Sequence, residues 1–295
     1  MLRAALRTRA GLLAGLVLLA VLVLAIVGPS LAPYDPYERT GEILSGPNPT
    51  NLLGTDYLGR DILSRLLAGA PLSVFSAVLV LVVGLIVGVI PALISVYSNR
   101  PFEWLSLRVA DTLITIPFMI FAVAVTQLIG NGVIQAMIVV GVMVSPAFYR
   151  VTRSATIAIG STQYVEAAYL AGASTAYVLR THVWHKVLPV IGIAGANIIG
   201  VGFIVISALT FLGIGVQPPH PTWGGMLATD LNYLAQNPTA PLFPSLLITV
   251  TIIALNGLAD ALRDVTGESG GRPKRARAPR APRTVRTTSE VAAGV

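Results

Sequence analysis

Long apolar segments without charge constrain this chain more than any other feature. The clearest extends from Leu66 to Asn99 and contains no Asp, Glu, Lys or Arg. A bilayer core about 30 Å thick is crossed by about 20 mainly apolar residues in a helix. Inside lipid the backbone must satisfy its own hydrogen bonds, which leaves only helices and closed barrels, and these segments lack the alternation of barrel strands. Six segments qualify as membrane-spanning helices, at residues 11–32, 72–98, 108–130, 133–149, 187–215 and 240–262.

Composition supports the same class of protein. Hydrophobic residues make up 54% of the chain and charged residues 11%, whereas soluble proteins are about 25% charged. This argues against a soluble enzyme and, because disorder requires low hydrophobicity, against a disordered chain. The sequence has no Cys, which excludes disulfides and thiolate metal or nucleophile sites. We therefore predict an all-α polytopic membrane protein with six transmembrane helices.

The first apolar segment shares some features with a cleaved signal peptide. Arginines precede it, and Ser30-Leu31-Ala32 is similar to a cleavage site. However, the apolar core is longer than the usual stretch of about 7–15 residues, and Pro33 would follow the cut. We expect residues 11–32 to be retained as the first transmembrane helix, after an N-terminus at 1–10.

Basic residues are distributed unevenly between the two sides of the predicted bundle. Of the 20 Lys and Arg, only Arg39, Arg60 and Arg65 lie on the side with the loops at 33–71 and 216–239. The positive-inside rule makes that side external and the opposite side, with both termini, cytoplasmic.

The last segment of the chain, residues 265–295, carries most of the formal net charge of +7. Its basic residues stand among Pro, Ala and Thr without apolar periodicity, which indicates a disordered basic cytoplasmic tail. The excess charge therefore reports topology and a tail, and gives no indication of nucleic-acid binding.

Prolines and glycines occur inside the predicted spans. Pro91, Pro117 and Pro146 are expected to kink their helices. Gly84 and Gly88 permit close helix packing.

The long cytoplasmic loop at 150–186 has the pattern of a short capped helix. Ser161 or Thr162 can cap its start, Gly172 suits its end, and Ser174 can cap a second helix. Its alanines expose little side chain, so another surface can approach the backbone closely. This suits a helix seated in a partner's groove, although an ordinary interfacial amphipathic helix has the same pattern.

The motif Glu166-Ala167-Ala168-x-x-x-Gly172 resembles the EAA loop of ABC importer permeases. Segments 53–70, 207–224 and 256–264 resemble signatures of the dipeptide/oligopeptide/nickel permease family, and the likeness extends over about 30–266. The chain looks like the C-type subunit of the permease pair. It departs from the family at Tyr169, where Arg is usual, and at 184–186, where Leu-Pro-Asn is usual.

The resemblance implies a type I ABC importer permease fold with a cytoplasmic coupling helix that rests in a groove of an ATPase. The residues it implies for coupling to the ATPase are Tyr164, Val165, Glu166, Ala167, Ala168, Gly172, Ala173 and Ser174. Implied partners are a B-type permease subunit, two ABC ATPase subunits, an external substrate-binding protein and membrane lipid, in the bacterial inner membrane.

The chain itself offers no nucleotide site. A P-loop needs Lys followed by Ser or Thr, whereas Lys186 and Lys274, the only lysines, precede Val and Arg. ATP and Mg are therefore expected on partner ATPases, with no catalytic residue and no cofactor on this chain.

Two external segments are candidates for a gate or for docking of the binding protein. Residues 59–69 predict an amphipathic helix on the membrane surface, which can equally be a simple anchor. Asp56 with Arg60, or Asp61 with Arg65, can form exposed ion pairs that contribute about 0.2–1 kcal/mol.

The second external candidate is the proline-rich stretch Gln217–Trp223. It predicts an ordered turn with Trp223 at the membrane interface, and a plug over the pathway is a further possibility.

Other classes fit less well. The three histidines, His182, His185 and His220, lie outside the spans and form no zinc motif, so no metal site is expected. Asp111 and Asp260 are each three residues from an Arg, which predicts local pairs rather than an intramembrane enzyme. A channel would need a filter sequence, which this chain lacks, and it would have no need of an EAA loop.

Nickel remains an alternative to di- or oligopeptides as substrate, although the spans hold no His or Cys cluster.

Overall fold

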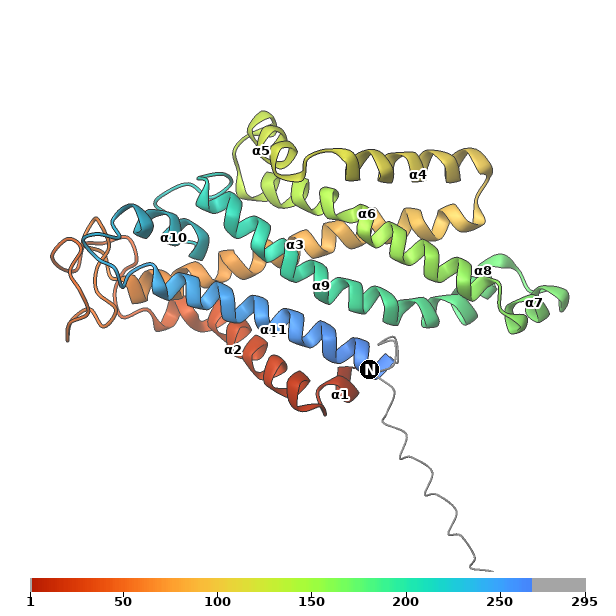
Figure 1. Ribbon diagram of the computed structural model, residues 1–295, viewed down its shortest axis with the longest axis horizontal. Helices are drawn as coiled ribbons and strands as arrows, with labels where there is room; N and C mark the ends of the chain where they lie inside the picture. Colours follow the sequence, from red (N-terminus) through yellow and green to blue (C-terminus); the bar gives the residue numbers. More distant parts are fainter. Residues whose placement is uncertain (1, 267–295) are drawn as a thin grey trace, which may run out of the picture.

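The computed structural model describes residues 2–266, so the predicted tail at 265–295 lies almost entirely outside the described residues. No β-strand occurs in this part of the chain, which confirms the all-α class. Five long helices lie side by side along one axis (Figure 1). They are α2 (Arg9–Leu31), α3 (Ile62–Tyr97), α6 (Val133–Gly160), α9 (Trp184–Phe211) and α11 (Leu242–Thr266).

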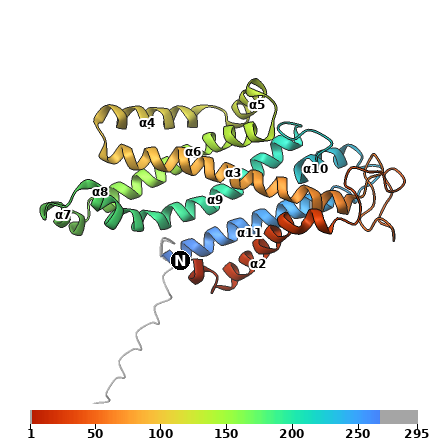
Figure 2. The same cartoon turned by 180° about the vertical axis from the view of Figure 1, so that it is seen from behind.

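Shorter helices lie against the sides and at the two ends of this bundle. Seen from behind, α1 and α2 lie along α11 (Figure 2). Residues 33–61 and α10 lie together at one end of the bundle, which we call the α10 end, and α7 and α8 lie at the opposite α7 end (Figure 1). The shorter elements are α1 (Leu2–Ala5), α4 (Arg100–Thr115), α5 (Phe118–Ile129), α7 (Gln163–Leu170), α8 (Thr175–Val178), the π-helical turn η1 (Leu179–Val183) and α10 (Trp223–Asn232).

The predicted third span, 108–130, is wrong as a single helix. The chain forms α4 and α5, which meet at an angle of 100°. The break falls at Ile116 and Pro117, because a residue before proline is disfavoured in the α conformation and Ile116 is extended. The described residues therefore contain five helices long and apolar enough to cross a membrane, or six if the bent pair counts as one span.

The second span begins earlier than predicted. No separate surface helix occupies residues 59–69, because α3 starts at Ile62 and continues unbroken to Tyr97 through Pro71 and Pro91. Ile62, Leu66 and Ala70 are buried, so the apolar face assigned to the membrane surface packs inside the protein.

The helices at the α7 end are also longer than their predicted spans. Helix α6 extends to Gly160, past the expected end at 149. Residues from Thr175 to Phe211 form one helical run of 37 residues, which contains Pro189 and begins well before the expected start at 187.

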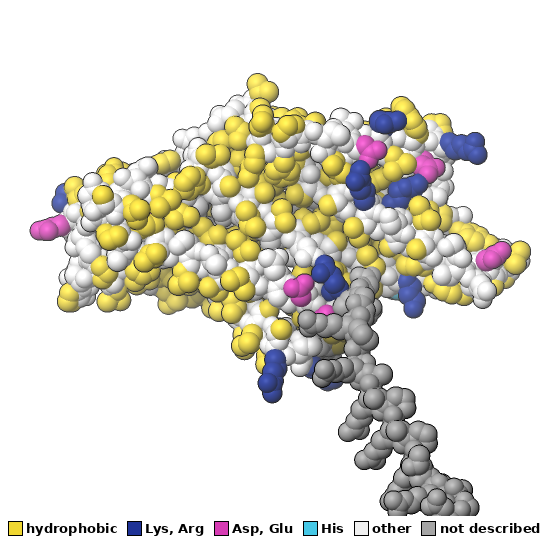
Figure 3. Space-filling model, in the orientation of Figure 1, with side chains coloured by type: hydrophobic (Ala, Val, Ile, Leu, Met, Phe, Trp, Pro, Cys, Tyr) yellow, Lys and Arg dark blue, Asp and Glu magenta, His cyan; other side chains and the backbone are white. Residues whose placement is uncertain are grey.

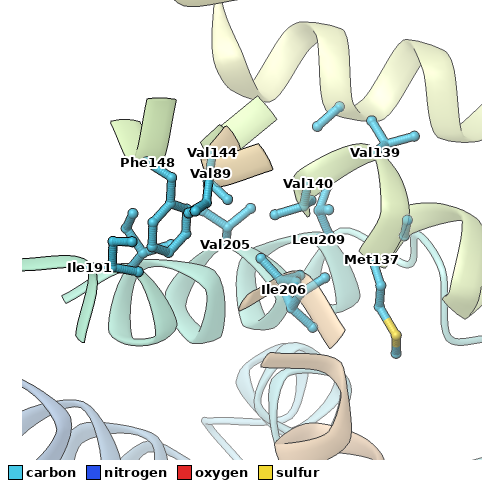
Figure 4. Packing of buried hydrophobic residues seen from close by; sticks show 14 of the residues in the cluster. Val89, Met137, Val139, Val140, Val144, Phe148, Ile191, Val205, Ile206 and Leu209 are labelled. Atoms are coloured by element: carbon cyan, nitrogen blue, oxygen red, sulfur yellow. The ribbon is translucent and has the colours of Figure 1, made fainter. Parts of the chain in front are cut away.

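The core forms where α3, α6 and α9 meet. A Cβ added at Gly88 would lie 2.4 Å from the carbonyl oxygen of Ser145 and 2.6 Å from Cβ of Phe148, so only glycine permits this approach of α3 to α6. Phe148 is fully buried. Figure 4 shows how side chains from the three helices pack there. The labelled residues are Val89, Met137, Val139, Val140, Val144, Phe148, Ile191, Val205, Ile206 and Leu209.

Charge and apolar surface are separated along the bundle. On the face shown in Figure 3, hydrophobic side chains cover the middle of the helices, and most visible charged side chains lie in the half with α4 and α7. An apolar belt of exposed leucines and isoleucines is the surface expected of helices in lipid.

Candidate functional site

At the α10 end, residues 33–61 form a compact loop that holds an ion network. Gly54 and Gly59 take positive φ values of 85° and 79°, the left-handed conformation that glycine adopts without steric cost. The turn between them points the Asp56 carboxylate back at the chain. Its Oδ1 accepts hydrogen bonds from the backbone N–H groups of Leu58 at 2.9 Å and Arg60 at 3.0 Å.

The same carboxylate binds two arginines. Arg60 Nη2 lies 2.7 Å and Arg65 Nε 3.4 Å from Asp56 Oδ2. All three side chains are less than 10% exposed. The prediction of an exposed Asp56–Arg60 pair is therefore wrong about its environment: the pair forms, but it is buried.

Arg65 connects three segments. Besides Asp56, it donates hydrogen bonds to the carbonyl oxygen of Pro36 at 2.8 Å and to that of Pro219 at 3.4 Å. The loop before α3 and the loop before α10 are thereby tied to the first turn of α3. Removing the charge of Arg65 would leave these contacts and half of the Asp56 pairing unmade.

Asp61 does not pair with Arg65 as predicted. It is the N-cap residue of α3, and its Oδ2 accepts hydrogen bonds from the backbone N–H of Ser64 at 2.8 Å and from the Ser64 hydroxyl at 2.6 Å. Asn51 Nδ2 donates to Oδ1 at 3.0 Å. Helix capping satisfies an otherwise unpaired N–H. The carboxylate of Asp61 is therefore used for the cap and does not pair with Arg65.

Trp223 is buried inside the protein, so its ring is not exposed to lipid as predicted. The side chain is 0% exposed, and its Nε1–H donates to the carbonyl oxygen of Leu66 at 3.0 Å. Its backbone N–H donates to the Ser73 hydroxyl at 3.1 Å. Trp223 thus fastens α10 to α3, whereas Gln217 is exposed beside the cis peptide bond between Pro218 and Pro219.

A cavity of about 160 Å³, which we call the α10 cavity, lies beside this network. It is bounded by residues 56–65, the end of α9, the loop that follows α9, and α10. Its polar lining side chains are Asp56, Tyr57, Arg60, Arg65, Thr210, His220, Thr222, Thr229, Asp230 and Asn232.

Asp230 is the member of this site that sequence reasoning missed. The residue is 6% exposed, and its buried Oδ2 has no hydrogen-bond partner among the described residues. Burial, reinforced by the negative charge of Asp56 and opposed by Arg65, raises the pKa of Asp230 to about 7. A signal was present, since Asp230 is the only charged residue between Lys186 and Asp260.

At the α7 end, the EAA segment forms the expected short helix. Thr162 precedes α7, but its hydroxyl donates to the carbonyl oxygen of Ile159 at 2.6 Å and does not cap the helix. Gly172 has a φ of 85°, and the N–H of Ala173 bonds the carbonyl of Ala168 at 3.0 Å. This is the Schellman arrangement that ends a helix.

The second helix of this loop is capped as predicted. The hydroxyl of Ser174 accepts a hydrogen bond from the backbone N–H of Tyr177 at 3.3 Å. Only Val165 of α7 is fully buried, within the core cluster of α6 and α9. Glu166 and Ala167 are exposed, and Leu170 is 85% exposed. The helix is held by Val165 and, less deeply, by Ala168, and it presents its other faces outward.

The remaining predicted pairs are partly replaced. Asp260 and Arg263 form the expected local pair at 3.3 Å. Asp111 instead pairs with Arg150 of α6 at 2.7 Å, while Arg108 lies over the ring of Trp104. In residues 2–266, no group of three or more His, Asp or Glu side chains is placed to hold a metal ion. His182 contacts the rings of Tyr164 and Tyr177.

A bundle with five or six helices long and apolar enough to cross a membrane defines the class as a polytopic helical membrane protein. The model of the family "binding-protein-dependent transport system inner membrane component" matches residues 81–267, and that of the N-terminal transmembrane domain of oligopeptide transport permease C matches residues 1–50. The chain belongs to this family of ABC importer permeases.

Similar proteins agree with this assignment. The chain is 33% identical over 264 residues to the glutathione transport system permease protein GsiD of Pectobacterium atrosepticum, covering 88% of this chain and 87% of that one. It is 34% identical over 262 residues to the di/tripeptide transport system permease protein DppC of Pseudomonas aeruginosa, covering 86% of each. The inward-facing MetNI methionine ABC transporter has a chain of similar fold, with a TM-score of 0.54 and 19% identity over 69% of this chain and 96% of that one.

Proposed function

We propose that this permease forms half of the membrane pathway for di- or oligopeptide uptake. The observation that carries the substrate class is its relatedness over most of its length to permeases named for glutathione and for di- and tripeptides. Glutathione is itself a tripeptide, so the two names share one chemical class.

The other half of the pathway is a B-type permease subunit, with two ABC ATPase subunits on the cytoplasmic side and a substrate-binding protein outside. ATP and Mg bind to the ATPases, and this chain takes no part in hydrolysis. Six spans provide half a pathway, and neither Lys186 nor Lys274 stands in a P-loop.

We place both termini and α7 in the cytoplasm of a bacterial cell and the α10 end outside. The distribution of Lys and Arg between the loops supports this orientation.

Helix α7 is the proposed coupling helix. Tyr164, Glu166, Ala167 and the turn at Gly172 are exposed, which suits contact with an ATPase groove. Val165 anchors the helix in the core, and the helical run from Thr175 to Phe211 follows closely. A displacement of α7 is thereby passed to a helical run that extends to the opposite end of the protein.

Nickel is less well supported than peptides as the substrate. Its recognition favours imidazole or thiolate ligands, and the described spans bring no such cluster together. The α10 cavity is lined by hydroxyl, amide, carboxylate and guanidinium groups and by the single imidazole of His220.

The test is ATP-driven uptake by the reconstituted complex of this chain, the B-type permease and two ATPases, supplied with the substrate-binding protein. Labelled dialanine, glutathione and Ni²⁺ are supplied separately to proteoliposomes that contain ATP. We expect uptake of peptide only when both ATPases are present. Uptake of Ni²⁺ without peptide uptake, or failure of this chain to assemble with the ATPases, would contradict the proposal.

A further inference from the structure

The α10 cavity contains a buried acid that the coupling mechanism does not use. Asp230 lines the cavity, is 6% exposed, and leaves Oδ2 without a hydrogen-bond partner among the described residues. A buried polar atom without a partner is costly, and such atoms in native structures call for a ligand or a functional reason.

The charged and titratable groups around Asp230 come from three segments. The loop at 56–60 contributes Asp56, Tyr57 and Arg60, α3 contributes Arg65, and the loop before α10 contributes His220. The end of α9 contributes Thr210 and Phe211, which carry no charge.

The two arginines are already engaged. Both bind Asp56, and Arg65 also bonds the carbonyl groups of Pro36 and Pro219. Asp230 forms no ion pair among the described residues, so it is the carboxylate of the lining that can still accept a positively charged partner.

The size of the cavity and the hydrogen-bond acceptors in its lining restrict the kind of ligand further. The cavity of about 160 Å³ is many times larger than the roughly 10–15 Å³ that one water molecule needs, so it has room for the end of a small molecule. Thr210, Thr222 and Thr229 are among the residues that line it, and the hydroxyl of each keeps acceptor capacity beside its existing bonds. A group with several N–H donors and one positive charge matches this lining.

We propose that the α10 cavity is a binding site for a primary ammonium group, with Asp230 as its counter-ion, and that the group it receives is the free N-terminus of the peptide substrate. The second half of this statement rests on the proposed peptide transport. The end of α9, which follows α7 along the chain, forms one wall of the cavity, so occupancy at one end and displacement at the other act on the same helix.

The first experiment measures occupancy without transport. The purified complex, without its binding protein, is treated with a carbodiimide, which modifies protonated carboxyl groups, and labelling at Asp230 is quantified by mass spectrometry. We expect dialanine or methylammonium at saturating concentration to lower labelling of Asp230 about tenfold, the order expected for a charge-assisted hydrogen bond. N-acetyl-dialanine, which lacks the ammonium group, leaves the labelling unchanged.

Two outcomes would overturn the proposal. Equal labelling with and without dialanine and methylammonium would mean that Asp230 binds only a proton. Equal protection by dialanine and N-acetyl-dialanine would mean that the cavity does not recognise the ammonium group. Labelling of the exposed Glu38 in the same sample serves as the internal control.

The second experiment measures transport by the variants Asp230→Asn and Glu38→Gln. Asn keeps the shape of Asp and removes a buried carboxylate, so the complex should assemble normally, which gel filtration checks. We expect Asp230→Asn to lower dialanine uptake about tenfold, while Glu38→Gln, the same change at an exposed site, leaves it unchanged. If the complex with Asp230→Asn took up dialanine as well as the complex without substitutions, a role of Asp230 in transport would be overturned.

Failure of the proposed function would look different. If the unmodified complex takes up no peptide, peptide transport is wrong, and methylammonium protection still decides whether the cavity binds ammonium. If peptide is taken up but neither dialanine nor methylammonium protects Asp230, the cavity proposal alone is wrong.

Discussion

The two ends of the bundle are built on opposite principles. At the α10 end, charged side chains are buried and share partners: Asp56 binds Arg60 and Arg65 inside the protein. At the α7 end, most charged side chains face outward, and Val165 is the only fully buried residue of α7. The first arrangement holds loops in one geometry, and the second leaves a surface free for another protein. The comparison predicts that changes at the α10 end cost stability, whereas changes on the surface of α7 cost coupling.

The largest loss of stability is expected for Asp56→Asn. Two buried guanidinium groups would lose their counter-ion, and breaking a buried ion pair costs about 3–5 kcal/mol. The melting temperature of the purified complex in detergent should fall steeply. Glu38→Gln is the matched exposed control, and an equally mild effect of both variants would remove the distinction between the two ends.

A pH dependence is expected from Asp230. Its pKa is raised to about 7 in the folded protein, so the folded state binds the proton more tightly than the unfolded state. Between the ordinary Asp pKa of about 4 and pH 7, stability then decreases as pH rises, and the full penalty is present above pH 7. Asp230→Asn should flatten this part of the melting-temperature profile. An unchanged profile in the variant would assign the dependence to another group.

A smaller loss is expected for Val165→Ala. This truncation removes two buried methyl groups from the anchor of α7, and the lost burial plus cavity amounts to about 2 kcal/mol. The melting temperature should fall moderately, and ATPase stimulation should fall with it because α7 is no longer held in place. Full coupling in this variant would mean that the anchor is not needed.

The smallest effect on stability is expected for Leu170→Ala. Leu170 is 85% exposed, and surface substitutions usually change stability by less than about 0.5 kcal/mol. We nevertheless expect weaker stimulation of ATP hydrolysis, because an exposed leucine on the proposed coupling helix would contact the ATPase. Ile43→Ala, an exposed apolar residue at the α10 end, is the control. If Leu170→Ala lowered the melting temperature and left the stimulation of ATP hydrolysis unchanged, this surface would serve stability and not coupling.

Local sequence signals predicted features that depend on neighbours along the chain. Gly172 was expected to end a helix and does so, and Ser174 caps the next helix as expected. Pro117 was expected to disturb the third span, although the pattern indicated a kink and the structure has a 100° break. Each of these positions is decided within one or two helical turns.

Environments set by distant segments were predicted poorly. Trp223 was expected at a membrane interface, yet it is buried because Leu66 and Ser73, about 150 positions earlier, supply its hydrogen-bond partners. Asp61 was expected to pair with Arg65, yet Arg65 meets carbonyl groups of two remote prolines. No periodicity along the chain encodes such contacts.

By itself the sequence determined that this is a helical membrane protein of the ABC importer permease class, because uncharged apolar length and the motif at Glu166 are local properties. Only the tertiary structure decided that Asp56, Arg60, Arg65 and Asp230 form one buried site. Their charges are separated by up to 174 positions, and it is the packing of α10 against α3 that removes them from water and makes them act on one another.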